Sequence, residues 1–392
     1  MPEDFAIKQE QYELLRQQAE FAYGNNDLNT ALVLFREALQ FEVNKAECLS
    51  NIAKVYISLT ELDTAEYYLL KALQEDKDSY KALVNFGLLQ YKKNEYNKAI
   101  IYYEKALRVN PNIDGILSNI GNTYAKLQNY QLAEEYHLKA CEIGKNSLIS
   151  QYNLGCFYYK VNRFQEAVNI LAPILDMVPK THQSDVFFLL SESYFNLNKF
   201  DDAILYYIKL IDRCPKEVYY YWQVVIILKA QKKYTQAIEY LIKILEFDRG
   251  NQAVWENLVL CCVNSSSHPK ARLYAKEAIA YLPDSEYILF QNSHYFYLDK
   301  EYEQALMLIE KALLFDPYFP AYQNLLGLIY YQMNELIKAY EAFELVGKKI
   351  EQYSSDFSVE LLEESANILR VSGDVLKAEL FDLKIKKLRS KE

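Results

Sequence analysis

The sequence contains little glycine, proline, tryptophan or methionine, and these shortages limit what the chain can do. Its 392 residues include 10 glycines, 9 prolines, 2 tryptophans and 4 methionines. Phosphate-binding loops and the GxSxG turn of serine hydrolases need glycine at set positions. No GxSxG is present, and most of the glycines fall inside a repeating pattern. We therefore expect no catalytic loop outside that pattern.

Histidine and cysteine are also scarce, and both are scattered along the chain. There is no HExxH among the histidines and no CxxC among the cysteines. Zinc sites and redox motifs need such close spacings. We expect no metal and no other cofactor, and we expect reduced cysteines that pack as small apolar residues. The residues concerned are His137, His182, His268, His294, Cys48, Cys141, Cys156, Cys214, Cys261 and Cys262.

One short stretch, GKNS at residues 144–147, resembles the end of a phosphate-binding loop. Lys139 occupies the place of the motif's first glycine, and a helical pattern precedes the stretch where the motif requires a strand. Because the phosphate chemistry depends on that context, we predict no nucleotide site. The sequence as a whole predicts a protein that is not an enzyme.

Long apolar runs and an excess of positive charge are both missing. No stretch approaches the roughly 18 to 20 apolar residues of a membrane-spanning helix. The start, MPEDFAIKQEQYELL, lacks the basic and apolar regions of a secretion signal. The formal net charge of −10 disfavours nucleic acid, anionic membrane surfaces and acidic partners. We expect a cytoplasmic protein with no nucleic-acid partner and no membrane insertion.

Two distant stretches read almost alike: NKAIIYYEKALRVNPN at residues 97–112 and EQALMLIEKALLFDPY at residues 303–318. Such repetition is typical of a stack of equivalent units. One alanine marks the same place in both stretches, and its equivalents recur at steps of 34 residues, interrupted by one step of 36 and one of 39. These landmark alanines define eleven repeats: Ala31, Ala65, Ala99, Ala133, Ala167, Ala203, Ala237, Ala271, Ala305, Ala339 and Ala378.

Small residues usually stand twelve positions before the landmark, which predicts a close contact between two helices. Small side chains let helix axes approach near the lower end of about 8 to 10 Å. Apolar residues recur at three- and four-residue steps on both sides of the contact, as in helices. The small residues are Ala19, Ala53, Gly87, Gly121, Gly155, Ser191, Ser293, Gly327 and Ala366, whereas Val225 and Val259 are exceptions.

Helix-ending residues also keep this register. Five positions before the landmark stand residues that tolerate the left-handed backbone that closes a helix: Asn26, Asn94, Asn162, Asn198, Asn334 and Gly373. Twelve positions after it stand prolines, which cannot continue a helix: Pro111, Pro179, Pro215, Pro283 and Pro317. Each repeat is thus predicted to be a helix, a tight turn, a second helix and a longer turn.

At these residues the chain resembles the tetratricopeptide repeat, a 34-residue helical hairpin. The resemblance covers roughly residues 5–390, and recurrent tyrosines support it: Tyr56, Tyr124, Tyr158, Tyr194 and Tyr330. It implies an all-α fold, namely an α-solenoid of antiparallel helical hairpins wound as a right-handed superhelix. It also implies protein binding in the concave groove that the first helix of each hairpin lines, although it does not identify the partner.

We expect the repeats to fall into three parts. Residues 1–178 carry repeats one to five, residues 179–350 carry repeats six to ten, and residues 351–392 form a capping hairpin. Pro173 lies in the body of a second helix, where proline removes a backbone hydrogen bond and is expected to kink the helix. Two extra residues follow in VPKTHQSD. A change of curvature is therefore predicted near residues 173–184.

The position fourteen residues before the landmark predicts a ladder of side-chain amides along the groove. A carboxamide offers both donors and an acceptor, so a row of them can pair with the backbone of an extended peptide. The row is similar to the asparagine ladder of the tetratricopeptide part of O-linked N-acetylglucosamine transferases, whose catalytic domain has no counterpart here. The other interpretation is a merely solvated inner face. The candidates are Asn51, Asn85, Asn119, Asn153, Gln223, Asn257 and Gln291.

Aromatic residues accompany these amides in repeats five to ten. Aromatic anchors flanked by hydrogen-bonding groups are typical of binding hot spots. The other interpretation is that a tight superhelix buries some of them against one another, since an aromatic stripe at helical spacing often belongs to a core. The candidates are Tyr152, Tyr159, Phe188, Phe195, Tyr219, Trp222, Tyr287, Phe290, Tyr297 and Tyr331.

One binding mode of the family is the capture of a chaperone's acidic C-terminus by lysine, arginine and asparagine. The matching places here hold Arg16, Glu20, Asn51, Lys81 and Asn85. Glu20 stands where the resemblance requires asparagine, and Asn85 stands where it requires arginine. These changes add a repulsive charge and remove a favourable one, so they oppose carboxylate capture.

These patterns together predict a scaffold or adaptor that binds an extended peptide or partner segment in its concave groove. The main alternative is a non-catalytic targeting or regulatory subunit of an enzyme complex. A chaperone-docking co-chaperone is a third hypothesis. The sequence leaves self-association open.

Overall fold

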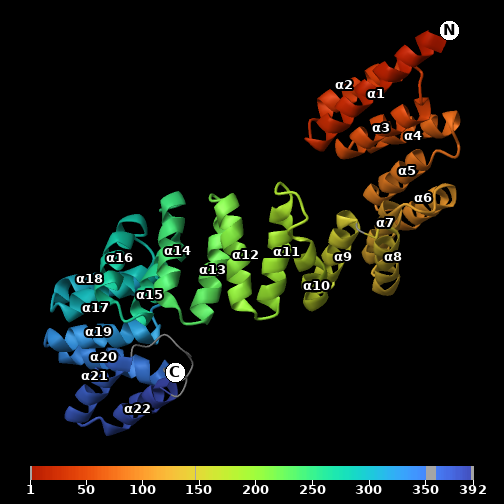
Figure 1. The fold of residues 1–392 in the computed structure, drawn as a ribbon. Coiled ribbons are helices and arrows are strands. Elements are labelled where there is room, and N and C mark those ends of the chain that lie inside the picture. Colours follow the sequence, from red (N-terminus) through yellow and green to blue (C-terminus); the bar gives the residue numbers. More distant parts are fainter. Residues whose placement is uncertain (1, 146, 350–358, 390–392) are drawn as a thin grey trace. The chain divides into compact units, whose positions relative to one another are not determined.

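The computed structural model describes residues 2–145, 147–349 and 359–389, and these residues form helices and turns without any β-strand. Part of the predicted capping hairpin, residues 351–358, lies outside the described residues. Figure 1 shows the helices: α1 (Pro2–Gly24), α2 (Leu28–Leu39), α3 (Lys45–Ser58), α4 (Leu62–Glu75), α5 (Tyr80–Lys92), α6 (Tyr96–Val109), α7 (Asp114–Lys126), α8 (Tyr130–Ile143), α9 (Leu148–Lys160), α10 (Phe164–Ile174), α11 (Gln183–Asn196), α12 (Phe200–Arg213), α13 (Val218–Ala230), α14 (Tyr234–Phe247), α15 (Gln252–Asn264), α16 (His268–Tyr281), α17 (Glu286–Leu298), α18 (Tyr302–Leu313), α19 (Pro320–Gln332), α20 (Leu336–Lys349), α21 (Val359–Val371) and α22 (Val375–Arg389).

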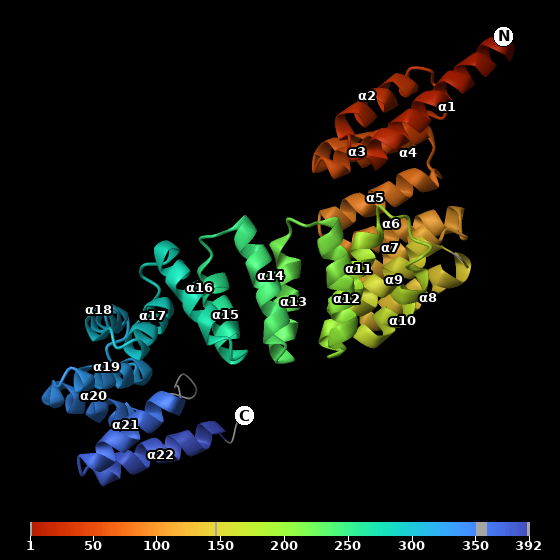
Figure 2. The same ribbon diagram turned by 60° about the vertical axis from the view of Figure 1, so that its left-hand side comes forward.

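The helices pack as successive hairpins, which confirms the predicted all-α solenoid. Helix α3 packs on α4, α5 on α6 and α7 on α8, and the same pairing recurs in α13 to α22 (Figure 2). In each repeat we call the odd-numbered helix, which comes first, helix A and the even-numbered helix B. Neighbouring A helices also touch, since α3 contacts α5, α5 contacts α7 and α7 contacts α9.

The chain divides into two compact units, Met1–Leu210 and Ile211–Glu392, which we call the N-terminal and C-terminal units. Each has its own apolar core, with Ile52 and Leu69 fully buried in the first and Leu325 and Phe343 fully buried in the second. The boundary between them lies within α12. The change of curvature expected near residues 173–184 concerns the rotation between repeats five and six, and it stays a prediction.

The small residue twelve positions before the landmark lies where helices A and B meet, as predicted. Ser293 Oγ donates a hydrogen bond to the carbonyl oxygen of Ala305, 2.7 Å away. A Cβ atom added to Gly121 would lie 3.1 Å from the carbonyl oxygen of Ala133. All eleven landmark alanines are at most 1% exposed. The eleven-repeat register inferred from the sequence is therefore the register of the fold.

The turn between helices A and B closes through a residue of positive φ in every repeat. The six residues predicted for this role have it, from 56° at Asn198 to 90° at Gly373. The other five repeats adopt the same conformation with residue types that do not favour it: Thr60, Gln128, Lys232, Ser266 and Lys300. The hairpin geometry therefore sets this backbone conformation, and the residue type adjusts only its cost.

Thr60→Asn is expected to stabilise the N-terminal unit, because Thr60 is a β-branched residue at φ 63°. The left-handed conformation costs an ordinary residue about 1 to 2 kcal/mol, and asparagine avoids part of that cost. We expect the free energy of unfolding in urea to rise by about 0.5 to 1 kcal/mol. Thr60→Val keeps the branch at Cβ and should give no gain. Equal effects of the two changes would show that the backbone is not strained.

Helix α10 contains Pro173 and ends one residue after it, at Ile174. Helix α10 has 11 residues, while α6 and α8 have 14 each. The Gln183 side-chain amide donates to the carbonyl oxygens of Leu175 and Val178, at 3.2 and 3.1 Å. These bonds satisfy carbonyl groups beyond the shortened helix. A short helix that contains Pro173 is thus followed by a braced turn, and the kink itself stays a prediction.

Three further observations concern membrane-spanning helices, metal ligands and cysteines. Among the described residues, no helix has both the length and the apolar character needed to cross a membrane. The same residues contain no group of three or more His, Cys, Asp and Glu side chains arranged to hold a metal ion. The six cysteines are free; Cys48, Cys261 and Cys262 are buried as predicted, whereas Cys214 is exposed.

Candidate functional site

Four positions of helix A lie on one side of the helix, and we call this side the inner face. They stand 18, 14, 11 and 7 residues before the landmark, and steps of four, three and four residues keep to one face of an α-helix. In α7 they are Gly115, Asn119, Asn122 and Lys126. The A helices α3, α5, α7 and α9 are neighbours in the N-terminal unit. Their inner faces therefore form one continuous strip.

Three amides of the predicted ladder are available on this strip. Asn51, Asn119 and Asn153, on α3, α7 and α9, are each half-buried. Within the described part of the chain, no hydrogen bond engages the side-chain amide of any of them. Each amide therefore keeps both its donors and its acceptor for another molecule.

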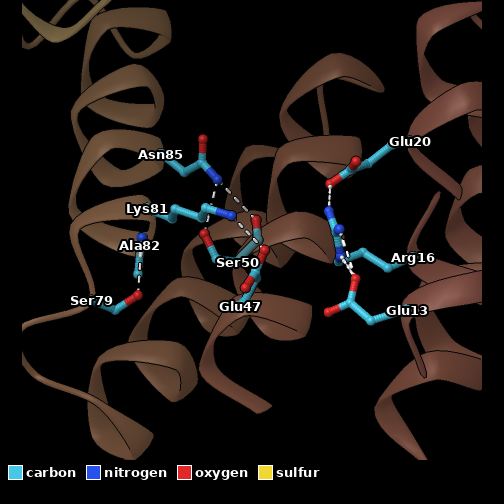
Figure 3. A network of polar contacts seen from close by, with 9 residues as sticks. All are labelled: Glu13, Arg16, Glu20, Glu47, Ser50, Ser79, Lys81, Ala82 and Asn85. Atoms are coloured by element: carbon cyan, nitrogen blue, oxygen red, sulfur yellow. Dashed lines mark hydrogen bonds and ion pairs between the residues drawn. The ribbon is translucent and has the colours of Figure 1, made fainter. Parts of the chain in front are cut away.

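Asn85, the fourth amide of the strip, has a different role. It is only 8% exposed. Its Nδ2 donates to the carbonyl oxygen and to Oγ of Ser50, at 3.0 and 2.9 Å (Figure 3). Ser50 belongs to α3 and Asn85 to α5, so this pair joins the second repeat to the third. The structure thus places Asn85 in a contact between repeats, where its amide is already engaged.

The cations at the family's carboxylate-capturing places are paired inside the chain (Figure 3). Arg16 contacts Glu13 at 2.7 Å and Glu20 at 2.6 Å. The hydrogen bond with Glu13, together with that of Glu20, raises the pKa of the Arg16 guanidinium. Lys81 contacts Glu47. A bound terminal carboxylate would have to displace one of these internal carboxylates.

The candidate aromatics of repeats five and six are partly open to solvent. Tyr152, Tyr159, Phe188 and Phe195 are all half-buried in the N-terminal unit. The ring of Tyr159 lies 6.0 Å from that of Phe164, and the ring of Phe195 lies 6.2 Å from that of Phe200. Burial raises the pKa of the Tyr152 and Tyr159 hydroxyls, so both stay neutral donors at physiological pH.

In the C-terminal unit the candidates near α13 are the most accessible. Tyr219 is 41% exposed, and Trp222 and Gln223 are half-buried. Tyr287 and Gln291 on α17 and Tyr331 on α19 are also half-buried. Asn257 is engaged within the chain: its Nδ2 donates to the carbonyl oxygen of Ala253 at 2.7 Å, and its Oδ1 accepts from Lys229 Nζ.

Phe290 and Tyr297 are buried, at 8% and 6% exposure, so these two do not form the exposed anchors that the sequence predicted. The Tyr297 hydroxyl donates to Glu364 Oε1 at 2.6 Å, which joins the ninth repeat to the eleventh. Phe290 packs on Tyr322 with ring centroids 5.0 Å apart. In the repeat between them the inner-face residue Leu325 is fully buried. Phe290, Tyr297 and Leu325 thus belong to the core, as the second interpretation of the aromatic stripe required for some of these residues.

Three lysines that were not among the predicted site residues lie on the same strip. Lys92, Lys126 and Lys160 stand seven residues before the landmarks of repeats three, four and five, at the C-terminal ends of α5, α7 and α9. All three are exposed. Within the described residues, none of them forms an ion pair. A lysine recurring at a step of 34 residues was the available signal.

His137 lies in the core, as expected from its place in the hairpin. It is fully buried in α8, against Phe157 and beside the backbone of Gly121. Neither ring nitrogen has a hydrogen-bond partner among the described residues. Burial, with a smaller contribution from the charge of Lys160, lowers its pKa to about 4. An uncharged histidine enclosed in this way serves packing.

Comparisons with known proteins agree with the repeat register. Sequence models of the tetratricopeptide repeat match residues 80–113, 115–148 and 185–217, which are repeats three, four and six of the register derived above. No curated protein sequence matches the chain.

Several solved structures are similar in part. PilF of Pseudomonas aeruginosa is 19% identical, with a TM-score of 0.43 over 54% of this chain and 96% of that one. PilW, described as a type IV pilus biogenesis factor, is 20% identical, with a TM-score of 0.45 over 52% and 94%. TTC0263, a tetratricopeptide-repeat protein of Thermus thermophilus, is 18% identical, with a TM-score of 0.43 over 47% and 99%.

The assignment to a family therefore rests on the repeats themselves. Three of them match the family's sequence models. All eleven share the buried landmark alanine and the left-handed turn residue. The chain belongs to the tetratricopeptide-repeat proteins.

Proposed function

We propose that this protein is an interaction scaffold whose inner face in the N-terminal unit binds an extended segment of another protein. One observation carries the proposal. Asn51, Asn119 and Asn153 present half-buried amides on the A helices of one strip, and these amides have no hydrogen-bond partner among the residues that the structure describes, while Asn85 between them braces the row. Tetratricopeptide repeats as a class bind proteins, and these amides supply a specific means of doing so.

The spacing of the amides suits an extended backbone. Packed helix axes lie about 8 to 10 Å apart. An extended chain advances about 3.3 Å per residue, so about three residues span the distance between neighbouring A helices. A half-buried amide is only partly hydrated, so replacing its water by a peptide group costs little and makes a directed bond. The half-buried aromatics of repeats five and six would extend the contact to apolar side chains.

The proposed role is non-catalytic. The inner face offers amides, aromatic rings and lysines, and the ring nitrogens of His137 are enclosed in the core away from it. A targeting or regulatory subunit of an enzyme complex would use the same surface. The scaffold role and the subunit role therefore differ only in whether the partner is an enzyme. The internal pairing of Arg16 and Lys81 disfavours the chaperone-docking role.

Changing Asn51, Asn119 and Asn153 together to Ala should weaken the partner complex at least about tenfold, because three hydrogen bonds of about 0.5 to 1.5 kcal/mol each are lost. The melting temperature should barely change, since none of these amides bonds within the described fold. Partners would be captured from lysate, identified by mass spectrometry, and then expressed and purified. Calorimetry would measure their affinities for the unchanged chain and for the triple variant.

Two controls accompany this test. Asn25, Asn97 and Asn112, which are exposed and lie outside helix A, should tolerate the same change without loss of binding. Asn85→Ala should instead cost about 1 to 2 kcal/mol of stability, because it removes a buried, hydrogen-bonded amide. Unchanged affinity in the triple variant would remove the amides from the mechanism.

A further inference from the structure

A row of unpaired positive charge accompanies the amides of the N-terminal unit. Lys92, Lys126 and Lys160 lie two helical turns beyond Asn85, Asn119 and Asn153 on the same faces of α5, α7 and α9. The three side chains are exposed, and no carboxylate among the described residues pairs with them. Each neighbour in the row belongs to the next repeat. The solenoid therefore repeats one cation three times along the strip.

Several other bases of the same unit, unlike this row, form ion pairs with carboxylates. Lys45 contacts Glu75, Lys93 contacts Glu66, and Arg163 contacts Glu134. Lys81, at the opposite end of the inner face of α5, is paired with Glu47. Carboxylates thus pair with several bases of this unit, whereas none among the described residues pairs with the row, although the net charge of the chain is −10.

The geometry of the solenoid sets the spacing of the charges. With helix axes about 8 to 10 Å apart, equivalent side chains of successive repeats are separated by a similar distance. An extended chain in the polyproline II conformation has three residues per turn and advances about 3.1 Å per residue, so side chains three residues apart point the same way and lie about 9 Å apart. Carboxylates at every third residue of a segment in this conformation therefore match the row, whereas carboxylates at every second residue point in different directions.

We propose that the segment bound by this inner face is acidic, with Asp or Glu at every third residue facing Lys92, Lys126 and Lys160. This inference rests on the proposed function and names the chemistry of its ligand. The amides of Asn119 and Asn153 hold the backbone, and the lysines select the side chains. The net charge disfavours acidic partners for the chain as a whole, but charge is unevenly distributed, and this strip is locally positive.

Neighbouring carboxylates limit where the acidic segment lies. On the next inner face, that of α11, the corresponding positions carry Asp185 and Glu192. On α3 the first inner-face position is Glu47, which already pairs with Lys81. An acidic segment is thus favoured over α5 to α9 and disfavoured beyond α9. The half-buried aromatics of repeats five and six suit apolar residues that follow it.

The test uses the full chain and three fluorescein-labelled synthetic peptides of thirteen residues. The first has Glu at positions 3, 6 and 9 in a Ser/Ala/Thr background, the second has the same composition with the three Glu residues adjacent, and the third has Gln in place of Glu. Fluorescence anisotropy should show the first peptide binding best. Binding should weaken as the ionic strength rises above about 0.15 M, because the Debye length there is only about 8 Å and falls further with added salt.

The decisive variant is Lys92→Gln with Lys126→Gln and Lys160→Gln. It should bind the first peptide about tenfold more weakly, since each exposed pair contributes modestly, and it should bind the Gln peptide as the unchanged chain does. The matched control removes three exposed bases outside helix A: Lys77→Gln, Arg108→Gln and Lys145→Gln. It carries the same change in net charge and should leave binding intact.

The outcomes separate this inference from the proposed function. Equal binding of all three peptides, or equal loss in both triple variants, would overturn the acidic ligand. If the captured partner still depends on Asn119 and Asn153 in that case, the scaffold role stands without it. Tighter binding of a mixed-sequence single-stranded DNA oligonucleotide than of the first peptide would also overturn the inference, because the row would then serve phosphate groups.

Discussion

Gly121→Leu should destabilise the N-terminal unit by about 3 kcal/mol or more, because it overpacks the contact between helices A and B. Even a Cβ atom there would lie 2.8 Å from His137 Cδ2 and 3.1 Å from the backbone oxygen of Ala133. A leucine side chain needs far more space, and the main chain of α8 cannot yield as a flexible side chain would. Urea denaturation followed by circular dichroism would measure the loss.

The same helix offers a matched control for this prediction. Nothing lies within 4 Å of a Cβ atom added to Gly115, which is also in α7. Gly115→Leu should therefore be neutral or slightly stabilising, since leucine favours helix more than glycine does. Gly121→Ala should cost less in a His137→Ala background than alone, because the nearest obstacle is gone. Equal effects at the two glycines would contradict the repeat register.

His137→Leu should stabilise the chain by about 1 to 3 kcal/mol at neutral pH, because two buried nitrogens without partners are removed. The equivalent position holds leucine in other repeats, where Leu69, Leu171 and Leu241 are fully buried. Leu171 lies against a glycine, Gly155, just as His137 lies against Gly121. Leucine therefore fits this site in the repeat itself.

The substitution His137→Leu should also reduce the loss of stability at acidic pH. The pKa of His137 falls from 6.5 to about 4 on folding, so between these pH values the unfolded chain binds more protons than the folded chain. Stability is then fully present above pH 6.5 and falls as pH decreases toward 4, by about 3 kcal/mol for this group.

Denaturation at pH 7, 6, 5 and 4 would test this slope. The pKa of His294 is also lowered to about 4 by burial, so the C-terminal unit has a similar dependence, and the comparison is between variants. The difference between the unchanged chain and His137→Leu should widen as pH falls. A constant difference across this range would show that His137 is not kept neutral by the fold.

The fold could be predicted from the sequence because the same pattern of residues recurs in successive helical hairpins. The same structural requirement recurs in every hairpin at three positions: the landmark alanine, the small residue before it and the turn residue. Thr60 and Lys232 are not residue types that favour the left-handed conformation, yet both adopt it. The packing of the two helices sets the backbone conformation of the turn between them. The braced turn after α10 was not predicted, since it depends on the side chain of Gln183, which donates to the carbonyl oxygen of Leu175.

The candidate site was harder to predict, since exposure and pairing depend on residues in other repeats. Asn85 and Asn119 occupy equivalent positions, but only Asn85 meets a serine of the preceding repeat. Tyr297 is buried and donates a hydrogen bond to Glu364, two repeats farther on. The row that contains Lys126 was not predicted for a similar reason. Whether a lysine forms an ion pair depends on carboxylates in other repeats, and the sequence alone does not show which carboxylates lie nearby.

The central claim is that an extended partner segment lies along the inner face of the N-terminal unit. Photo-crosslinking from single sites tests it most directly, with p-benzoylphenylalanine placed at Asn119 or, as a control, at the exposed Ile101 on helix B. The account predicts adducts from position 119 that map to one short linear segment of the partner, and none from position 101. Adducts from position 101 alone, or equally from both positions, would contradict it.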